Sequence, residues 1–333
     1  MSRVGTEGVV GLGLQTDILT QATTLFYAPV IDSNFNPQKA VRATPTEVSG
    51  APWQRSPYTA SVGFSGNASF HLRANKWLDA FLEALHGIPT SATVSGTAVK
   101  RIYKPSVTSN NGALPFLTVA QDNGLSQDIG VGVRPMGFSL QVPAANLVTA
   151  QAEFFGRLPV FSNSSVATTA VVDTSPDMTS CNATLTLDGT TPTNISNIQI
   201  QVRAEMTNNE NVVGSLYVQD ISMLQRSLNF SFDAYFQTDA LRNNVYRNGT
   251  TGSISSAVYQ AAFELDLISA KNIPGNSVPY GVTFKIPSLD YMAAPISLKG
   301  GQLTMLQFQG QVTLNVSDAT SVYSIEVISD FAQ

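Results

Sequence analysis

The 333-residue chain is poor in the residues that most enzymes and metal proteins use for their chemistry. Its single cysteine, Cys181, excludes an internal disulfide framework and a four-cysteine zinc site. Two histidines, His71 and His86, leave little material for metal binding or histidine catalysis. Charged residues make up 12% of the chain, against about 25% in an average domain. Hydrophobic residues reach 43%, which is enough for a core, so the composition favours a folded protein that is not an enzyme.

Long apolar runs and dense basic clusters are also missing. No run approaches the roughly 20 residues of a membrane span, so no membrane insertion is expected. The first ten residues lack the apolar core of a signal peptide, so we expect no export by that route. The densest basic cluster, Lys100-Arg101 with Lys104, is too small to predict a surface that grips nucleic acid. Residues 1–165 carry 11 basic and 9 acidic side chains and residues 166–333 carry 7 and 14, so the net charge of −5 resides in the second half.

Short stretches of the first half recur in the second half in the same order. Residues 137–144, GFSLQVPA, match residues 281–288, GVTFKIPS, in identity or type at every position, 144 positions apart. Three shorter matches are 41–43 with 202–204, 67–70 with 229–232, and Phe154 and Gly156 with Phe308 and Gly310. Any one match is compatible with chance, but four matches in the same order predict an internal duplication of one domain.

Each half also carries one helical pattern after a predicted strand. The first pattern begins at Asn75, a candidate N-cap, and stops at Gly87. Its apolar residues follow helical spacing and predict one buried face: Trp77, Leu78, Phe81, Leu82 and Leu85. The second pattern is poorer, with Thr238 as the predicted cap and Gly249 as the stop.

Nearly all other periodic segments predict strands. Apolar and polar residues alternate in residues 61–70, 195–203, 229–236, 258–268, 281–286 and 303–316. The sequence therefore predicts a mainly β fold of two tandem antiparallel barrels or sandwiches, each with one flanking α-helix. We assign residues 1–162 to the first domain, 163–180 to a linker and 181–333 to the second domain. Two long connections, residues 44–60 and 205–215, occupy equivalent places and predict contact or assembly surfaces.

These features resemble the tail tube proteins of long-tailed bacteriophages, of the non-contractile siphophage type with two tube domains in tandem. The residues that carry the resemblance are the strand at 61–70 with its capped helix, the GFSLQVP and GVTFKIP strands, and residues 11–16 followed by 26–30. The likeness covers most of the chain.

The resemblance implies that three chains form a pseudo-hexameric ring and that rings stack into a hollow tube that conducts DNA without binding it specifically. It implies tape measure, tail terminator and distal tail or baseplate proteins as partners. The expected location is the virion tail, assembled in the host cytoplasm. No catalytic, metal or cofactor-binding residue is expected.

Several residues allow a chemical as well as a structural interpretation. Glu264 and Asp266 share a predicted strand face, and paired carboxylates can hydrolyse glycosides, but two acids on a solvated strand face are far commoner. Asp79 is expected to serve as favourable charge near a helix N-terminus, and His86 as a cation in the last turn of that helix. The glycine-rich residues 8–13 predict a flexible N-terminal arm, because no dinucleotide-binding unit surrounds them.

A second class of function also stays open, an adhesive, tail-tip, capsid-decorating or carbohydrate-binding β-protein. Exposed aromatic platforms would favour it, and Trp53 and Tyr58 in the 44–60 connection are the candidates. Seven Asn-x-Ser/Thr sequons suit a secreted glycoprotein, but a chain rich in these residues produces them without that meaning.

Overall fold

The computed structural model describes residues 8–43, 56–105, 114–166, 169–192, 194–207, 212–249, 253–298, 300, 303–312 and 322–331. Within these ranges the chain forms seventeen β-strands, two α-helices and one 3-10 turn. Every pairing between these strands is antiparallel, so the predicted mainly β fold is confirmed. In the part of the chain described, no helix is long and apolar enough to cross a membrane.

The elements follow one another in two halves. The first half holds β1 (Val9–Gln15), β2 (Phe26–Ala28), β3 (Asp32–Arg42), β4 (Tyr58–His71), α1 (Lys76–His86), β5 (Thr90–Ser95), β6 (Ala98–Tyr103), β7 (Phe116–Asp122), β8 (Gln127–Pro143) and β9 (Thr149–Ser162). After the turn Ser180–Asn182, the second half holds β10 (Ala183–Leu187), β11 (Ile195–Met206), β12 (Met223–Tyr235), α2 (Ala240–Arg247), β13 (Gln260–Asn272), β14 (Pro279–Ala293), β15 (Ile296–Ser297), β16 (Met305–Gln311) and β17 (Ser324–Ser329).

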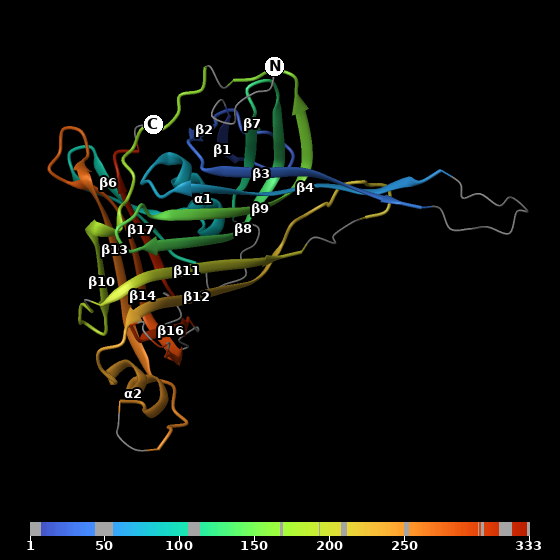
Figure 1. The fold of residues 1–333 in the computed structure, drawn as a ribbon. Helices are drawn as coiled ribbons and strands as arrows, with labels where there is room; N and C mark the ends of the chain where they lie inside the picture. Colours follow the sequence, from blue (N-terminus) through green and yellow to red (C-terminus); the bar gives the residue numbers. More distant parts are fainter. Residues whose placement is uncertain are drawn as a thin grey trace, which may run out of the picture.

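Seven strands from both halves form one continuous sheet, which we call the seven-stranded sheet. Its order is β3, β4, β9, β8, β11, β12 and β16, and the first six of these strands lie side by side across Figure 1. The step from β8 to β11 joins the halves, because residues 137–143 pair with residues 197–203. Alternate side chains of six of these strands, together with Phe35 of β3, enter one apolar core that contains residues of both halves.

The two halves share one order of strand pairing. In the first half the order is β3-β4-β9-β8-β7-β1, and in the second it is β11-β12-β16-β14-β13-β10. Three irregularities recur at corresponding points: an extra residue at Ala60 and at Leu224, another at Met136 and at Met292, and a wider step at 130–133 and at 286–289. The spacing is 164 positions for the first and 156 for the other two. Because a bulge locally bends and twists its strand, irregularities at the same place in the pairing order mark corresponding backbone positions.

The sequence matches are displaced from these corresponding positions. The pairing relates Gly137 to Ala293, 156 positions on, whereas the GVTFKIP match begins at Gly281. It relates Asn67 to Ser231, two positions beyond the matched Asn229. The correspondence between positions of the two halves therefore follows from the strand pairing and differs from the alignment of the sequence matches.

Helix α1 forms as its sequence predicts. Asn75 Oδ1 accepts the N–H of Leu78 at 2.9 Å, and Gly87 adopts a φ of +100° while its N–H donates to the Glu83 carbonyl. The predicted apolar face is buried, and the rings of Trp77 and Phe81 stack 6.2 Å apart. This helix therefore anchors the core of the first half.

Helix α2 departs from its prediction. Its N-cap is Asp239 and not Thr238, and no side-chain hydrogen bond caps it. Asn248 ends it in the left-handed conformation, followed by Gly249 at a φ of +76°. None of its residues is fully buried, so α2 stands at the surface of the second half, at the lower end of Figure 1.

The predicted flexible N-terminal arm is wrong for residues 9–13, which belong to the core strand β1. This strand pairs with β2 and β7, and Val10 and Leu12 are buried. The glycines serve close packing, since a Cβ at Gly13 would lie 2.3 Å from the Thr24 carbonyl oxygen and one at Gly11 would lie 2.7 Å from the Tyr27 ring.

The segment predicted as a linker lies along the first half, apart from residues 167 and 168, which fall outside the described ranges. Met178 is buried, and its N–H donates to the Leu72 carbonyl at 2.9 Å. Arg73 Nε contacts Asp177 Oδ1 at 2.6 Å. The domain limits at 162/163 and 180/181 stay a prediction, because the core and the sheet run through both halves.

Candidate functional site: a polar sheet face with two open edges

The face of the seven-stranded sheet that points away from the core carries amide and hydroxyl side chains. One cross-strand row consists of Ser69, Gln151, Ser139, Gln201, Asn229 and Gln311. The adjacent row consists of Gln141, Gln199, Ser231 and Gln309. We call this surface the polar face. It crosses the joint between the halves without interruption and is shallowly hollowed over β11, β12 and β16.

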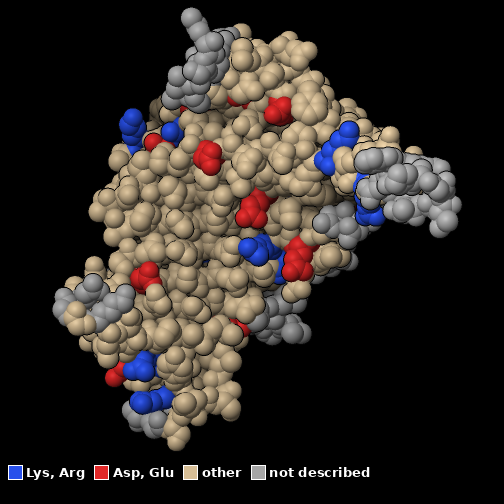
Figure 2. Space-filling model, turned by 45° about the vertical axis from the view of Figure 1, so that its right-hand side comes forward, with Lys and Arg blue, Asp and Glu red and all other residues tan. Residues whose placement is uncertain are grey.

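Charge is sparse on the molecule as a whole, and the two rows are uncharged, although Glu153, Arg203 and Asp233 lie beside them on the same face. The side of the molecule in Figure 2 shows isolated Lys, Arg, Asp and Glu side chains on a mostly uncharged surface. Lys and Arg contacts to phosphate dominate the affinity of proteins for nucleic acid. The two neutral rows offer DNA only weak hydrogen bonds that exchange readily with water.

Residues 293–298 extend the seven-stranded sheet beyond β16, and the two edges of this extended sheet have no neighbouring strand among the described residues. One is the outer edge of β3, where the Gln121 side chain accepts the Phe35 N–H at 3.2 Å and donates to the Ser33 carbonyl at 3.4 Å. The other, which we call the β14–β15 edge, is formed by residues 293–298 where they run beside β16. Open edges are templates for pairing with another chain.

The joint between the halves is held by buried arginines as well as by strand pairing. Arg134 donates to the Ile221 carbonyl at 3.1 Å and to the Leu114 carbonyl at 2.8 Å, and its guanidinium lies 3.8 Å from the Phe116 ring centre. Burial lowers the pKa of Arg134 to about 10, so it stays charged at neutral pH. Arg226 of β12 donates to the Leu85 carbonyl in the last turn of α1 at 2.9 Å.

His86 also links the halves, and its predicted role as a cation is wrong. Its Nδ1 lies 3.1 Å from the Leu82 carbonyl and its Nε2 lies 2.8 Å from the Tyr323 hydroxyl. A carbonyl only accepts, so Nδ1 carries the proton and Nε2 accepts from the tyrosine. Burial, together with the charge of Arg226, lowers the pKa of His86 to about 3. The imidazole is therefore neutral at physiological pH.

The remaining acidic and basic candidates are engaged in pairs. Asp79 is a buried acceptor for Arg101 and Tyr103, and burial raises its pKa although Arg101 opposes the shift. Its predicted role as helix-end charge is therefore secondary to this contact. Glu264 lies on the solvated face of β13, 3.2 Å from Lys285, and Asp266 follows on the same face.

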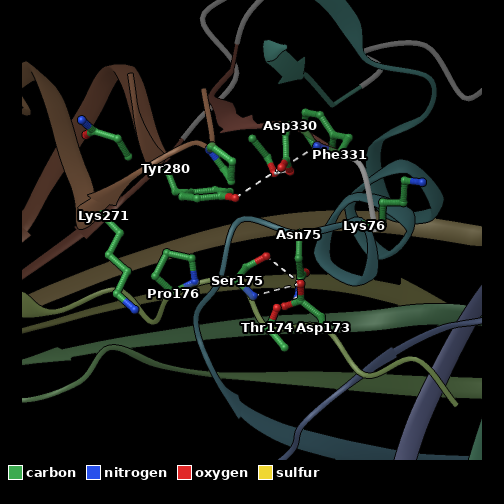
Figure 3. Close-up of a pocket in the computed structure, with 13 residues that line it drawn as sticks. Asn75, Lys76, Asp173, Thr174, Ser175, Pro176, Lys271, Tyr280, Asp330 and Phe331 are labelled. Carbon is green, nitrogen blue, oxygen red and sulfur yellow. Dashed lines mark hydrogen bonds between the residues drawn. The ribbon is translucent and has the colours of Figure 1, made fainter. Parts of the chain in front are cut away.

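A cavity of about 220 Å³ opens at a second contact between the halves, beside the N-terminus of α1 (Figure 3). Asp173 accepts from Asn75 Nδ2 at 2.7 Å and from Ser175 Oγ at 2.6 Å. Across the cavity the Tyr280 hydroxyl lies 3.4 Å from Asp330, and burial raises its pKa to about 12. The polar groups on each side of the cavity thus hydrogen-bond to their own neighbours, which is typical of a structural contact. Among the described residues no cluster of three or more His, Cys, Asp and Glu side chains is arranged to hold a metal ion.

Two extended arms project from the same side of the molecule, to the right in Figure 1. One is the β3–β4 hairpin and the other is the connection from β11 to β12. They contact each other where the Val62 N–H donates to the Leu216 carbonyl at 2.8 Å. Residues 44–55, with Trp53, and residues 208–211 lie outside the described ranges, whereas Tyr58 begins β4 half exposed.

The sequence comparisons agree with this architecture. No relative among the curated proteins matches the chain. A family model described as phage tail tube protein matches residues 5–320, nearly the whole chain. The polar face, the open edges and this match lead to one conclusion: the chain belongs to the phage tail tube protein family.

Proposed function

We propose that this chain is a structural subunit of a phage tail tube, without catalytic activity. It would be made and assembled in the host cytoplasm and reside in the tail of the virion. The family match supports a role in the tail tube. The structural observation that supports assembly into a ring is the polar face with its two open edges. Tape measure, tail terminator and distal tail or baseplate proteins are the expected partners at the ends of the tube.

Each chain supplies two tube domains produced by internal duplication. The repeated order of strand pairing and the three irregularities at corresponding places in that order support this origin. Three chains then complete a pseudo-hexameric ring, in which every second contact between domains is the β8–β11 joint already present within one chain. Head-to-tail contacts that close give a ring, and stacked rings give a tube.

The polar face lines the lumen of the tube. Its rows of Gln, Asn and Ser present neutral side chains to the DNA, so the DNA slides without being held at fixed points. The opposite face carries the apolar core and is covered by α1 and the remaining strands. The arms at one end of the strands reach the next ring.

Negative-stain electron microscopy of the purified chain at high concentration, with mass photometry, tests this function. Rings of three chains with a sixfold outline, or hollow rods built from them, are the expected result. Rings of six chains would overturn the trimeric arrangement and keep the tube. A monomer that joins neither rings nor preformed tail tubes offered as seeds would contradict the tube itself.

A further inference from the structure

The joint between the two halves supplies a template for a contact between two chains. In that joint, residues 137–142 of β8 pair with residues 198–203 of β11 in antiparallel register. The strand irregularities relate residues 137–142 to 293–298 and residues 198–203 to 33–38. The first corresponding segment forms the β14–β15 edge and the second forms the open edge of β3.

We propose that the open edge of β3 in one chain pairs with the β14–β15 edge of a second copy, in the register of the internal joint. This inference rests on the ring proposed above and names its contact. The pairing places Ser33 opposite Leu298, Phe35 opposite Ile296 and Pro37 opposite Ala294. The two edges lie at opposite ends of the sheet, so the contact is head to tail and repeats from chain to chain.

The backbone of β3 already points the required groups outward. In the internal joint the Ala144 N–H donates to the Ser196 carbonyl, so every second residue from Ser196 directs its amide and carbonyl toward β8. The corresponding residues of β3 are Ser33 and Phe35. Their outward direction follows from Gln121, which reaches the Ser33 carbonyl and the Phe35 N–H from outside the β3–β4 pair.

The β14–β15 edge has the complementary arrangement. The Pro295 carbonyl accepts the Gln307 N–H of β16 at 3.0 Å, so the flanking residues Ala294 and Ile296 direct their amides away from β16. The Tyr246 hydroxyl of α2 lies 3.4 Å from the Ala294 nitrogen. In the single chain, Gln121 and Tyr246 therefore hydrogen-bond to outward-facing backbone groups, one at each edge. In the ring, a neighbouring strand would bond to these same groups.

The side chains on both sides of the proposed contact match. Phe35 opposite Ile296 continues the apolar layer, since Phe35 is buried and Ile296 packs against the core. Asn34 opposite Ser297 continues the polar face, and both are exposed. Pro37 has no N–H to donate, so the contact between chains makes one backbone hydrogen bond fewer than the internal joint, where Val202 stands at this position.

A disulfide between Asn34→Cys and Ser297→Cys, in a Cys181→Ser background, tests the register. The two positions form a non-hydrogen-bonded antiparallel pair, whose Cα separation of about 4.5 Å suits a disulfide. Within one chain, six strands at about 4.8 Å spacing separate β3 from β15, so these cysteines cannot pair inside a monomer. Mild oxidation of assembled protein is expected to give covalent dimers and trimers on non-reducing gels, and nothing larger.

Two matched variants control the experiment. Gln141→Cys with Gln199→Cys sets the same geometry in the internal joint and is expected to form a disulfide within one chain. Gln38→Cys with Ser297→Cys is four positions out of register, about 13 Å along the strand, and is expected to stay reduced.

The outcomes separate this inference from the proposed function. Rings that form without the Asn34–Ser297 link, while the internal control links, overturn the edge pairing and keep the tube. A ladder that continues beyond three chains keeps the pairing and overturns closure at three. Absence of rings and rods in the unsubstituted protein, even with preformed tail tubes as seeds, overturns the ring, and this inference with it.

Discussion

His86 illustrates how a single residue can couple pH to the joint between the halves. The folded protein holds it neutral, with a pKa of about 3, whereas the unfolded chain has a pKa of about 6.5. As the pH falls below 6.5 the unfolded state binds the proton first, so this residue's contribution to stability is complete above pH 6.5 and is lost toward pH 3.

We therefore expect His86→Gln to flatten the dependence of stability on pH. Between pH 6.5 and 5 the unsubstituted protein should lose about 1.5 kcal/mol more unfolding free energy than the variant. Urea unfolding followed by tryptophan fluorescence measures both, after a pH 7 measurement shows that the variant is folded. Tyr323→Phe, which removes the hydroxyl but leaves the imidazole buried, should keep the original slope. Equal slopes for His86→Gln and the unsubstituted protein would contradict the neutral buried imidazole.

Gly13 shows a different residue-scale constraint, the close approach of β1 to the chain at Thr24. Gly13→Ala should destabilise the protein by about 1–3 kcal/mol, because the added methyl meets a backbone oxygen that cannot rotate away. Gly63→Ala is the matched control, since its methyl would meet only the Gly156 carbonyl at an ordinary 3.6 Å. Denaturant midpoints of the two variants give the comparison, and equal midpoints would count against the packing role of Gly13.

At the scale of single elements, the sequence predicts features that depend on neighbouring residues and misses features that depend on contacts distant in sequence. Helix α1 was predictable because Asn75, Gly87 and the apolar spacing between them act within a few turns of one another. Strand β1 was not, because its glycines are explained only by Tyr27 and Thr24, which the fold brings against them. Local pattern cannot distinguish a flexible glycine from a tightly packed one.

The register between the halves was likewise beyond the sequence. Hydrogen bonding in a sheet depends on backbone geometry, so GFSLQVP and GVTFKIP can resemble each other while lying twelve positions out of correspondence. Short runs of alternating residues suit many places in a sheet. The polar face was also missed, because its rows collect one or two residues from each of several strands that are distant in sequence.

The β3–β4 hairpin gives a prediction at this scale. Deleting residues 45–57 leaves Ala43 and Thr44 as a two-residue connection between Arg42 and Tyr58, which are paired. The protein should fold with an unchanged circular dichroism spectrum and form rings, but the rings should no longer stack into rods. Replacing residues 45–57 by a Gly-Ser segment of equal length separates loop chemistry from loop length. Loss of folding on deletion would instead place this connection in the core.

For the whole molecule, the polar face predicts how an assembled tube treats DNA. Gln199→Lys with Gln201→Lys places two cations on the proposed lumen, multiplied around the ring, so assembled tubes should retain DNA in a strongly salt-dependent manner. Thr93→Lys with Ser95→Lys adds the same charge on the exposed strand β5. Filter retention of short duplex DNA by tubes, measured from low to high salt, compares the two. Equal retention by both variants would argue against the polar face as the lumen.

The β8–β11 joint lies within one continuous chain, and this would change how the proposed ring is built. Six separate domains must meet and lose their independent motion, at about 4–15 kcal/mol for each association. In the proposed ring, each chain would arrive with every second contact already made, so closure would need only three bodies, whose paired halves have a high effective local concentration. The contacts within a chain would not dissociate on dilution. Only half of the contacts in the proposed ring would therefore be places where a wrong subunit could enter or a correct one could leave.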